Sequence, residues 1–282
     1  MDKFKGILFA ALSAATFGLI PLYANQAILD GVNNETILVY RYGIAGIVYA
    51  IYLLLRRMNM RLTRREVKEV TLAGVGGYGI TAFFLMWSYH YMPTGVATAI
   101  HFFYPVVVAL LMAIFYKERL PLEVKAGIVL AICGVYLLSW TPGEVKWLGL
   151  FFVLMSTVTY GCYITALNRP VLKRMNPDVL TCYVLLFTAL FYLILAVAQG
   201  KMEIITRPRF LLDMVQLAIL STIVSARLLV AAVPSSVLGT LEPITAIVVG
   251  VLYFNEQLTY ANYLGLLIVI VAVLVVICKM KK

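Results

Sequence analysis

The sequence predicts an all-α integral membrane protein, with about ten transmembrane helices arranged as an inverted repeat of two five-helix units. Three observations support this prediction: an apolar composition, a series of long apolar runs, and a pattern that occurs twice along the chain. Of the 282 residues, 63% are hydrophobic and 13% are charged, whereas soluble domains are about 45–50% apolar and about 25% charged. A soluble chain of this size could not bury so much apolar surface, so the excess must face lipid.

The apolar runs have the length that a bilayer requires. The hydrocarbon core is about 30 Å thick, so a spanning helix needs about 20 apolar residues. Helices are expected because lipid offers no partner to an unpaired peptide group, and the alternation typical of barrel strands is absent from the sequence. The candidate spans are residues 6–25, 36–55, 70–92, 94–116, 122–140, 147–167, 178–199, 214–232, 235–254 and 259–278.

The basic residues predict the orientation. A net charge of +10 could indicate a nucleic-acid partner, but these residues lie in short loops beside apolar runs, so no nucleic acid is expected. Seventeen of the 23 Lys and Arg residues fall on one side and four on the other, with Arg41 and Arg227 inside spans. The more positive side faces the cytoplasm. This predicts a multi-pass protein of the cell membrane with both termini cytoplasmic and the loop at Pro142 and Gly143 outside.

The five-helix pattern occurs twice. Residues 97–105 resemble residues 235–243, and residues 117–120 resemble residues 255–258, both at an offset of 138. We therefore predict one repeat over residues 1–141 and a second over residues 142–282. Five is an odd number, so the second copy enters the membrane from the opposite side. Such inverted repeats are common in membrane carriers.

The second copy is shorter than the first in its third helix, because the offset between matching residues falls there from 145 to 138. The best alignment places the gap between Ser225 and Ala226. We interpret it as the loss of about seven residues that the natural chain carries. Without them, span 214–232 barely crosses the bilayer and leaves Arg227 within hydrocarbon, at a cost of about 2.5–3.5 kcal/mol.

The doubled pattern, Pro105, the pair Glu242 and Pro243, and the acids Glu118 and Glu256 together resemble the drug/metabolite transporter superfamily, EamA type. The resemblance covers nearly the whole chain. It implies a ten-helix, exporter-like carrier with a central cavity between its two halves. Members of this superfamily move amino acids, other metabolites or drugs, and several are proton-coupled. The implied partners are a small-molecule solute, protons and the lipid bilayer.

Glu242 is the acidic residue that lies well inside a predicted span. A carboxylate at that depth is expensive unless it is paired, protonated or functional. One interpretation is a site for a proton or for the ammonium group of a solute. The other is a structural carboxyl that hydrogen-bonds neighbouring helices at the kink before Pro243. The sequence leaves both open.

His101 lies near the middle of its span and titrates near neutral pH in water. Two roles are open for it: a cavity residue, or a neutral histidine bonded to a backbone carbonyl. Pro21, Pro105 and Pro243 free backbone carbonyls at depth. Such breaks often line the substrate site of a transporter, and a simple kink is the alternative.

Three aromatic residues, Tyr78, Phe102 and Tyr160, lie deep enough to form the wall of a cavity, although packing alone is the simpler explanation for each. Arg41 lies near the outer end of its span, where snorkelling to the interface explains it and a cavity role is the alternative. Glu118 and Glu256 lie at helix ends and are expected to be ordinary solvated acids.

The leading functional hypothesis is a secondary transporter that works by alternating access and exports small polar or amphipathic metabolites such as amino acids. The alternatives are an intramembrane enzyme acting on lipid, which would need paired catalytic groups, and a channel, which would need rings of charge or carbonyls. No Gly-rich loop ending in Lys-Ser or Lys-Thr is present, so direct use of ATP is not expected. No metal or cofactor is expected, because metal-ligand spacing is lacking at the four cysteines, Cys133, Cys162, Cys182 and Cys278.

Overall fold

The computed structural model describes residues 3–140, 147–225, 227–228 and 241–280. Within these ranges all regular structure is helical. The elements are α1 Lys3–Phe17, α2 Ile20–Leu29, α3 Asn34–Leu55, α4 Arg64–Ala73, η1 Gly74–Gly79, α5 Ile80–Ser88, α6 Thr94–His101, α7 Tyr104–Phe115, α8 Leu122–Ser139, α9 Trp147–Ala166, α10 Pro170–Arg174, α11 Pro177–Ala198, α12 Pro208–Ala218, η2 Ile219–Val224, α14 Leu241–Phe254 and α15 Tyr260–Met280.

Among the described residues, eight helical segments are each long and apolar enough to cross a membrane. These are Leu8–Leu29, Asn34–Leu55, Arg64–Ser88, Thr94–Phe115, Leu122–Ser139, Trp147–Ala166, Pro177–Ala198 and Tyr260–Met280. The two remaining predicted spans coincide with α12 and η2, and with the shorter apolar helix α14. The prediction of an all-helical membrane protein is confirmed.

Two spans are interrupted near the predicted helix breakers. The first span breaks after Phe17, and Pro21 then lies in the first turn of α2. The fourth breaks after His101, and Pro105 lies in the first turn of α7. A proline is tolerated in a first turn because its missing N–H would have had no intrahelical partner there. The chain therefore divides these two spans where the prolines were expected to disturb them.

Two further spans contain a π-helical turn, η1 in the third span and η2 in the eighth. The two turns occupy matching positions, since each bound of η2 lies 145 residues after that of η1. The hydroxyls of Thr222, in η2, and of Ser225, directly after it, donate to the carbonyls of Leu217 and Leu220, five residues earlier in each case. The wide turn is therefore held by side chains as well as by the backbone. Turns of this kind are frequent at functional sites.

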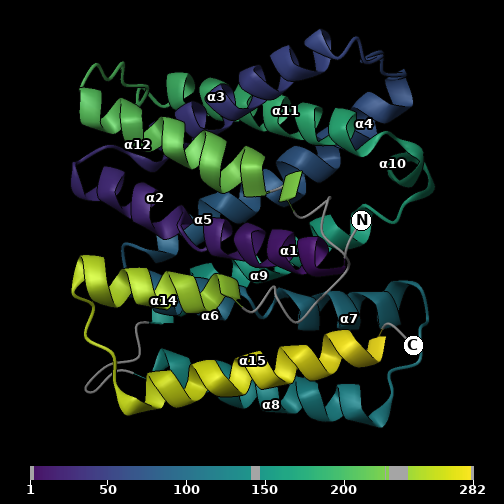
Figure 1. Ribbon diagram of the computed structural model, residues 1–282, viewed down its shortest axis with the longest axis vertical. Helices are drawn as coiled ribbons and strands as arrows, with labels where there is room; N and C mark the ends of the chain where they lie inside the picture. Colours follow the sequence, from purple (N-terminus) through teal and green to yellow (C-terminus); the bar gives the residue numbers. More distant parts are fainter. Residues whose placement is uncertain (1–2, 141–146, 226, 229–240, 281–282) are drawn as a thin grey trace.

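The helices of the two predicted repeats pack against one another in matching pairs. Helix α8 packs on α15 and α3 packs on α11, and these pairs lie toward opposite ends of the long axis of the bundle (Figure 1). Gly127 of α8 lies against Val276 of α15, and Gly265 of α15 lies against Leu138 of α8. At the repeat offset of 138, Gly265 is the counterpart of Gly127, and Val276 is the counterpart of Leu138. The contacts are therefore reciprocal, as a two-fold relation between the repeats requires.

A second pair of glycines repeats this reciprocity near the middle of the bundle. Gly18, between α1 and α2, lies against Thr245 of α14, and Gly161 of α9 lies against Val107 of α7. Thr245 lies two residues after Pro243, and Val107 lies two residues after Pro105. In each case the glycine of one repeat therefore contacts the matching residue of the other. A larger side chain at either glycine would meet atoms within 3 Å. The absence of a Cβ thus permits the close approach of the two halves.

Arg227, which the sequence places within hydrocarbon, has polar partners in the structure. Its Nη1 lies 2.7 Å from Oδ1 of Asp178, in the first turn of α11, and its Nη2 donates to the hydroxyl of Tyr52. Helix α12 begins at Pro208 rather than at residue 214, and the pairing with Asp178 compensates the Arg227 charge. The depth of Arg227 in the membrane stays a prediction. Ala226 lies outside the described residues, so the gap beside it stays a prediction.

Glu256 is not the solvated acid that its position at a helix end suggested. Its Oε1 accepts hydrogen bonds from the backbone N and Oγ1 of Thr94, and its Oε2 accepts one from the backbone N of Gly95. Helix α6 begins after Pro93, which offers no capping side chain. Glu256 caps α6 from the other half of the chain, and it satisfies N–H groups that would otherwise be unpaired.

The N-terminal end of α1 and the C-terminal end of α15 lie on the same side of the bundle, with α10 (Figure 1). We expect a Lys3→Cys variant in a cysteine-free background to resist a membrane-impermeant maleimide in intact cells, because the Lys and Arg bias predicts that this side is cytoplasmic. Thr206→Cys, in the exposed connection between α11 and α12, is the matched control and should react. The reverse labelling pattern would overturn the topology. Pro142 and Gly143 lie outside the described residues.

Candidate functional site

Glu242 lies in the first turn of α14, close to the break in the first span. Its backbone carbonyl faces Gly18, so the residue sits where α14 crosses between α1 and α2. The side chain is half-buried. Within the part of the chain that the structure describes, its carboxyl has neither a hydrogen-bond donor nor an ion-pair partner. The structural interpretation, a carboxyl bonded to neighbouring helices, therefore finds no donor among the described residues.

Tyrosines from three parts of the chain lie within electrostatic range of Glu242: Tyr89 after α5, Tyr104 of α7 and Tyr160 of α9. The rings of Tyr104 and Tyr160 meet edge to face, with centroids 4.7 Å apart. Tyr160 also contacts Tyr163 one turn further along α9, at 5.9 Å. Residues three apart share a helix face, so both tyrosines project toward the same region.

The ring contacts continue from α9 into the first half of the chain. Tyr163 lies 5.4 Å from Tyr78 of η1, and Tyr78 lies 5.6 Å from Tyr42 of α3. Tyr42 in turn stacks with Tyr192 of α11 at 6.3 Å. We call this set the tyrosine cluster. Its members are Tyr42, Tyr78, Tyr104, Tyr160, Tyr163 and Tyr192, three from each predicted repeat.

His101 ends α6 and joins the cluster from one side. Its ring centroid lies 5.3 Å from that of Tyr160, and the residue is 6% exposed. Its Nδ1 lies 2.9 Å from Oγ of Ser156, whose hydroxyl donates to the carbonyl of Val153. The Ser156 hydroxyl therefore lies within hydrogen-bond distance of both the His101 ring and a backbone carbonyl of its own helix. The partner is therefore a hydroxyl, and not the backbone carbonyl that one sequence interpretation suggested.

The remaining predicted site residues surround this region. Phe102 is buried, and its ring meets that of Tyr104 edge to face at 6.0 Å. Pro105 follows Tyr104 in the first turn of α7, and Pro243 is buried beside Glu242 in α14. The structure therefore brings His101, Phe102, Tyr78 and Tyr160 into one set of ring contacts. Tyr104 and Tyr160 connect that set to Glu242.

Arg41 differs most from its sequence interpretation. It is 4% exposed, so its side chain does not snorkel to the interface. The guanidinium lies 5.1 Å from the ring centroid of Tyr42, and Nε donates to Oγ1 of Thr222 in η2, at 3.3 Å. The snorkelling interpretation failed because the position of Arg41 along its own helix does not say which neighbouring helix covers the side chain. Sequence reasoning also missed Tyr42 and Tyr192, and it did not choose Tyr104 or Tyr163 as site residues. The spacing of Tyr160 and Tyr163 was the available signal.

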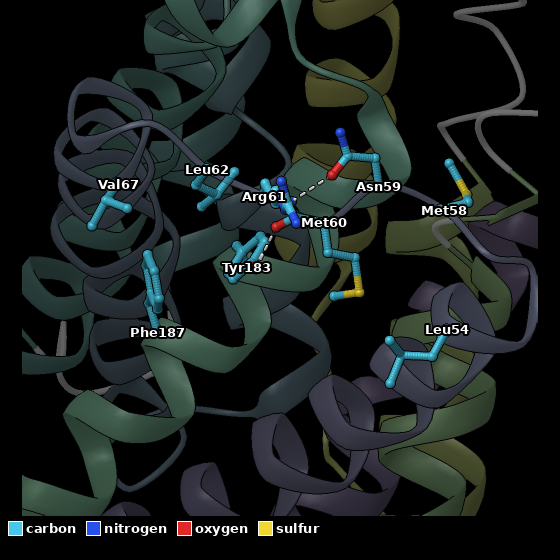
Figure 2. A pocket seen from close by; sticks show the side chains of 9 residues that line it. All are labelled: Leu54, Met58, Asn59, Met60, Arg61, Leu62, Val67, Tyr183 and Phe187. Carbon is cyan, nitrogen blue, oxygen red and sulfur yellow. Dashed lines mark hydrogen bonds between the residues drawn. The ribbon is translucent and has the colours of Figure 1, made fainter.

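A surface groove of 590 Å³ lies away from these residues, where the end of α3, the start of α4 and α11 meet. Its lining is mainly apolar and includes Arg61, Met60 and Tyr183, whose hydroxyl donates to the carbonyl of Met60 (Figure 2). None of the predicted site residues lines this groove. It is therefore separate from the tyrosine cluster.

Comparisons with known proteins find relatives that are named as transporters. The chain is 30% identical over 141 residues to an uncharacterized transporter of Archaeoglobus fulgidus, covering 50% of this chain and 49% of that protein. It is 27% identical over 167 residues to a protein of Streptantibioticus cattleyicolor named a probable terminal-alkyne amino-acid exporter, covering 58% and 55%. The chain thus spans about half the length of these curated relatives.

A solved crystal structure of a protein with 17% identity aligns over 100% of both chains with a TM-score of 0.71, which shows a shared fold. The sequence profile of the EamA-like transporter family matches residues 4–140 and also residues 147–278. The two matches together span nearly the whole chain, with all the helices that contribute to the tyrosine cluster. Taken with the all-helical membrane fold, this match places the chain in the EamA-like transporter family.

Proposed function

We propose that the protein is a secondary transporter that exports small amphipathic metabolites, amino acids among them, by alternating access. The observation that carries the proposal is the Glu242 carboxyl, unpaired among the described residues, beside tyrosines contributed by both repeats. An unpaired acid inside a membrane protein is a functional-site hypothesis by default. The relative named as a probable amino-acid exporter supports this solute class.

The tyrosine cluster suits a solute with an apolar body and a polar end. Ring faces bind apolar groups and attract cations. Their hydroxyls, among them those of Tyr104 and Tyr160, supply hydrogen bonds. Glu242 would bind a proton or the ammonium group of the solute. Exchange of a bound proton for the solute ammonium group at Glu242 would couple export to the proton gradient.

Alternating access requires contacts between the halves that open at one end while they hold at the other. Lys201 of the second repeat lies 2.8 Å from Glu35 of the first. On the other side of the bundle, Arg169 of the second repeat lies 2.6 Å from Glu69 of the first. In each pair the basic side chain is about half-exposed, whereas the carboxylate is largely buried. Water can reach each pair from the side of the basic residue, so both pairs can break and form again within a transport cycle.

The test is transport by purified protein in liposomes. We expect uptake of labelled L-amino acids that saturates with concentration and shows counterflow, in which unlabelled solute on one side drives labelled solute to accumulate. Counterflow requires one binding site that alternates between the two sides, so a channel cannot produce it. Flux that rises linearly with concentration and lacks counterflow would contradict the proposal. So would chemical conversion of the solute without net movement.

A further inference from the structure

Arg41 carries a permanent positive charge in a buried position with little compensation. It is 4% exposed, and its described hydrogen bonding is one contact, from Nε to the neutral hydroxyl of Thr222. A guanidinium has five N–H donors and is not deprotonated in proteins. Within the described ranges, no carboxylate lies within 4 Å of it. The donors of its two Nη atoms therefore have no acceptor in this part of the chain.

The groups around Arg41 do not neutralise its charge. The titratable residues within electrostatic range are Tyr42, Tyr78, Tyr89 and Tyr192, which are uncharged at neutral pH. The Tyr42 ring attracts the guanidinium through its face, at 5.1 Å. That attraction is small beside the cost of burying an unpaired charge. The site therefore favours an anion that arrives from outside the chain.

The chemistry of the guanidinium selects the kind of anion. Its planar fork of donors matches the two oxygens of a carboxylate, and it binds them with two parallel hydrogen bonds. Tyr89 lies within electrostatic range of both Arg41 and Glu242, so a cationic and an anionic group border the same region. The ring contacts from Tyr42 through Tyr78, Tyr163 and Tyr160 connect the two. Such a region suits a zwitterion with an apolar side chain.

We propose that Arg41 binds the carboxylate of the transported solute, and that this solute is a free amino acid rather than an amine or an amide. The proposal rests on the transport function proposed above. It identifies Arg41 as the residue that selects the solute. A solute that lacks the carboxylate would leave the charge of Arg41 buried and unpaired, which disfavours binding.

The first arm of the test uses the unaltered protein. Detergent-purified protein is titrated with the proteinogenic L-amino acids, each compared with its carboxamide and its decarboxylated amine, and thermal stabilisation is recorded. Hydrogen bonds to charged groups contribute about 1.5–3 kcal/mol, so we expect the amides and amines to bind about 10- to 100-fold more weakly than the acids. Liposome transport with the same three compounds should give the same order.

The second arm changes the side chain. Arg41→Gln should lose most of the affinity for the acid and no longer distinguish acid from amide. Arg41→Lys should recover part of the preference, since it keeps the charge and loses the fork. Arg61→Gln, in the groove, removes an arginine away from the cluster and should keep the full preference. The ratio of acid to amide affinity is the readout, because a purely structural role of Arg41 would not change it.

Each outcome decides something. If the unaltered protein binds acid and amide equally, or moves only solutes without a carboxylate, the assignment of Arg41 is overturned while the transport function stands. If no solute binds or moves, the transport function fails and the assignment fails with it. If the Arg41 variants do not fold, the comparison of compounds on the unaltered protein still decides.

Discussion

Replacing Glu242 with glutamine is expected to abolish pH-driven accumulation of solute while leaving solute exchange. Glutamine keeps the shape of the side chain and resembles its protonated form, but it cannot release a proton. The variant should fold, because the change removes a costly charge rather than a packed group. Exchange needs only a bound solute on each side of the membrane, so it can continue. The measurement is accumulation of a labelled amino acid in liposomes under an imposed pH gradient, with counterflow measured on the same preparation.

Two further variants sharpen this test. Glu242→Ala should lose exchange as well, because it leaves a void and removes the polar group beside Tyr104 and Tyr160. Glu118→Gln is the matched control, since Glu118 is an exposed acid in the connection between α7 and α8, and it should behave as the unaltered protein does. Accumulation by Glu242→Gln at the level of the unaltered protein would mean that Glu242 has a structural role. The coupling mechanism would then be rejected.

Replacing Gly265 with alanine is expected to destabilise the protein by separating α8 from α15. A Cβ at Gly265 would lie 2.6 Å from the backbone N of Leu138 and 2.8 Å from the carbonyl oxygen of Gly134. These are backbone atoms, so no side chain can rotate away and the helices must move apart. Overpacking of this kind costs about 1–3 kcal/mol, and small residues are what allow membrane helices to approach so closely. Thermal unfolding in detergent measures the loss.

Gly43→Ala is the matched control for this prediction. Gly43 also lies within a helix, α3, but a Cβ there would meet no atom within 4 Å. Alanine favours a helix over glycine by about 1 kcal/mol, so this variant should be as stable as the unaltered protein or more so. If Gly265→Ala unfolds at the same temperature as Gly43→Ala, then α8 and α15 are not in the close contact described here.

The sequence predicted most spans well because lipid imposes a simple requirement of length and apolarity. It placed two helix starts too late. Helix α4 begins at Arg64 rather than residue 70, and α12 begins at Pro208 rather than residue 214. Both helices open with a charged, amphipathic turn that a hydropathy window excludes. In α4 that turn is held by a capping box between Thr63 and Glu66, which stabilises a helix outside the bilayer as well as within it.

The prediction of the candidate site was partial for a related reason. His101, Phe102, Tyr78 and Tyr160 were chosen for their depth, and the structure brings them into contact. Arg41 and Glu256 were interpreted from their own helices alone, as a snorkelling residue and a solvated acid. Their actual partners, Thr222 and Thr94, lie in the opposite repeat. No local pattern could indicate those contacts.

The sequence by itself determined that this chain is a helical membrane protein, predicted that a five-helix pattern occurs in it twice, and placed an acidic residue, Glu242, within a predicted span. Each follows from composition, run length or repetition, which act along the chain. Only the tertiary structure decided that tyrosines from both repeats form one cluster, that Glu242 is unpaired among the described residues, and that Arg41 is buried without a counter-ion among them. These depend on which helix faces meet, and between membrane helices that choice is made by close packing rather than by hydrophobicity, since lipid is as apolar as the helix surfaces.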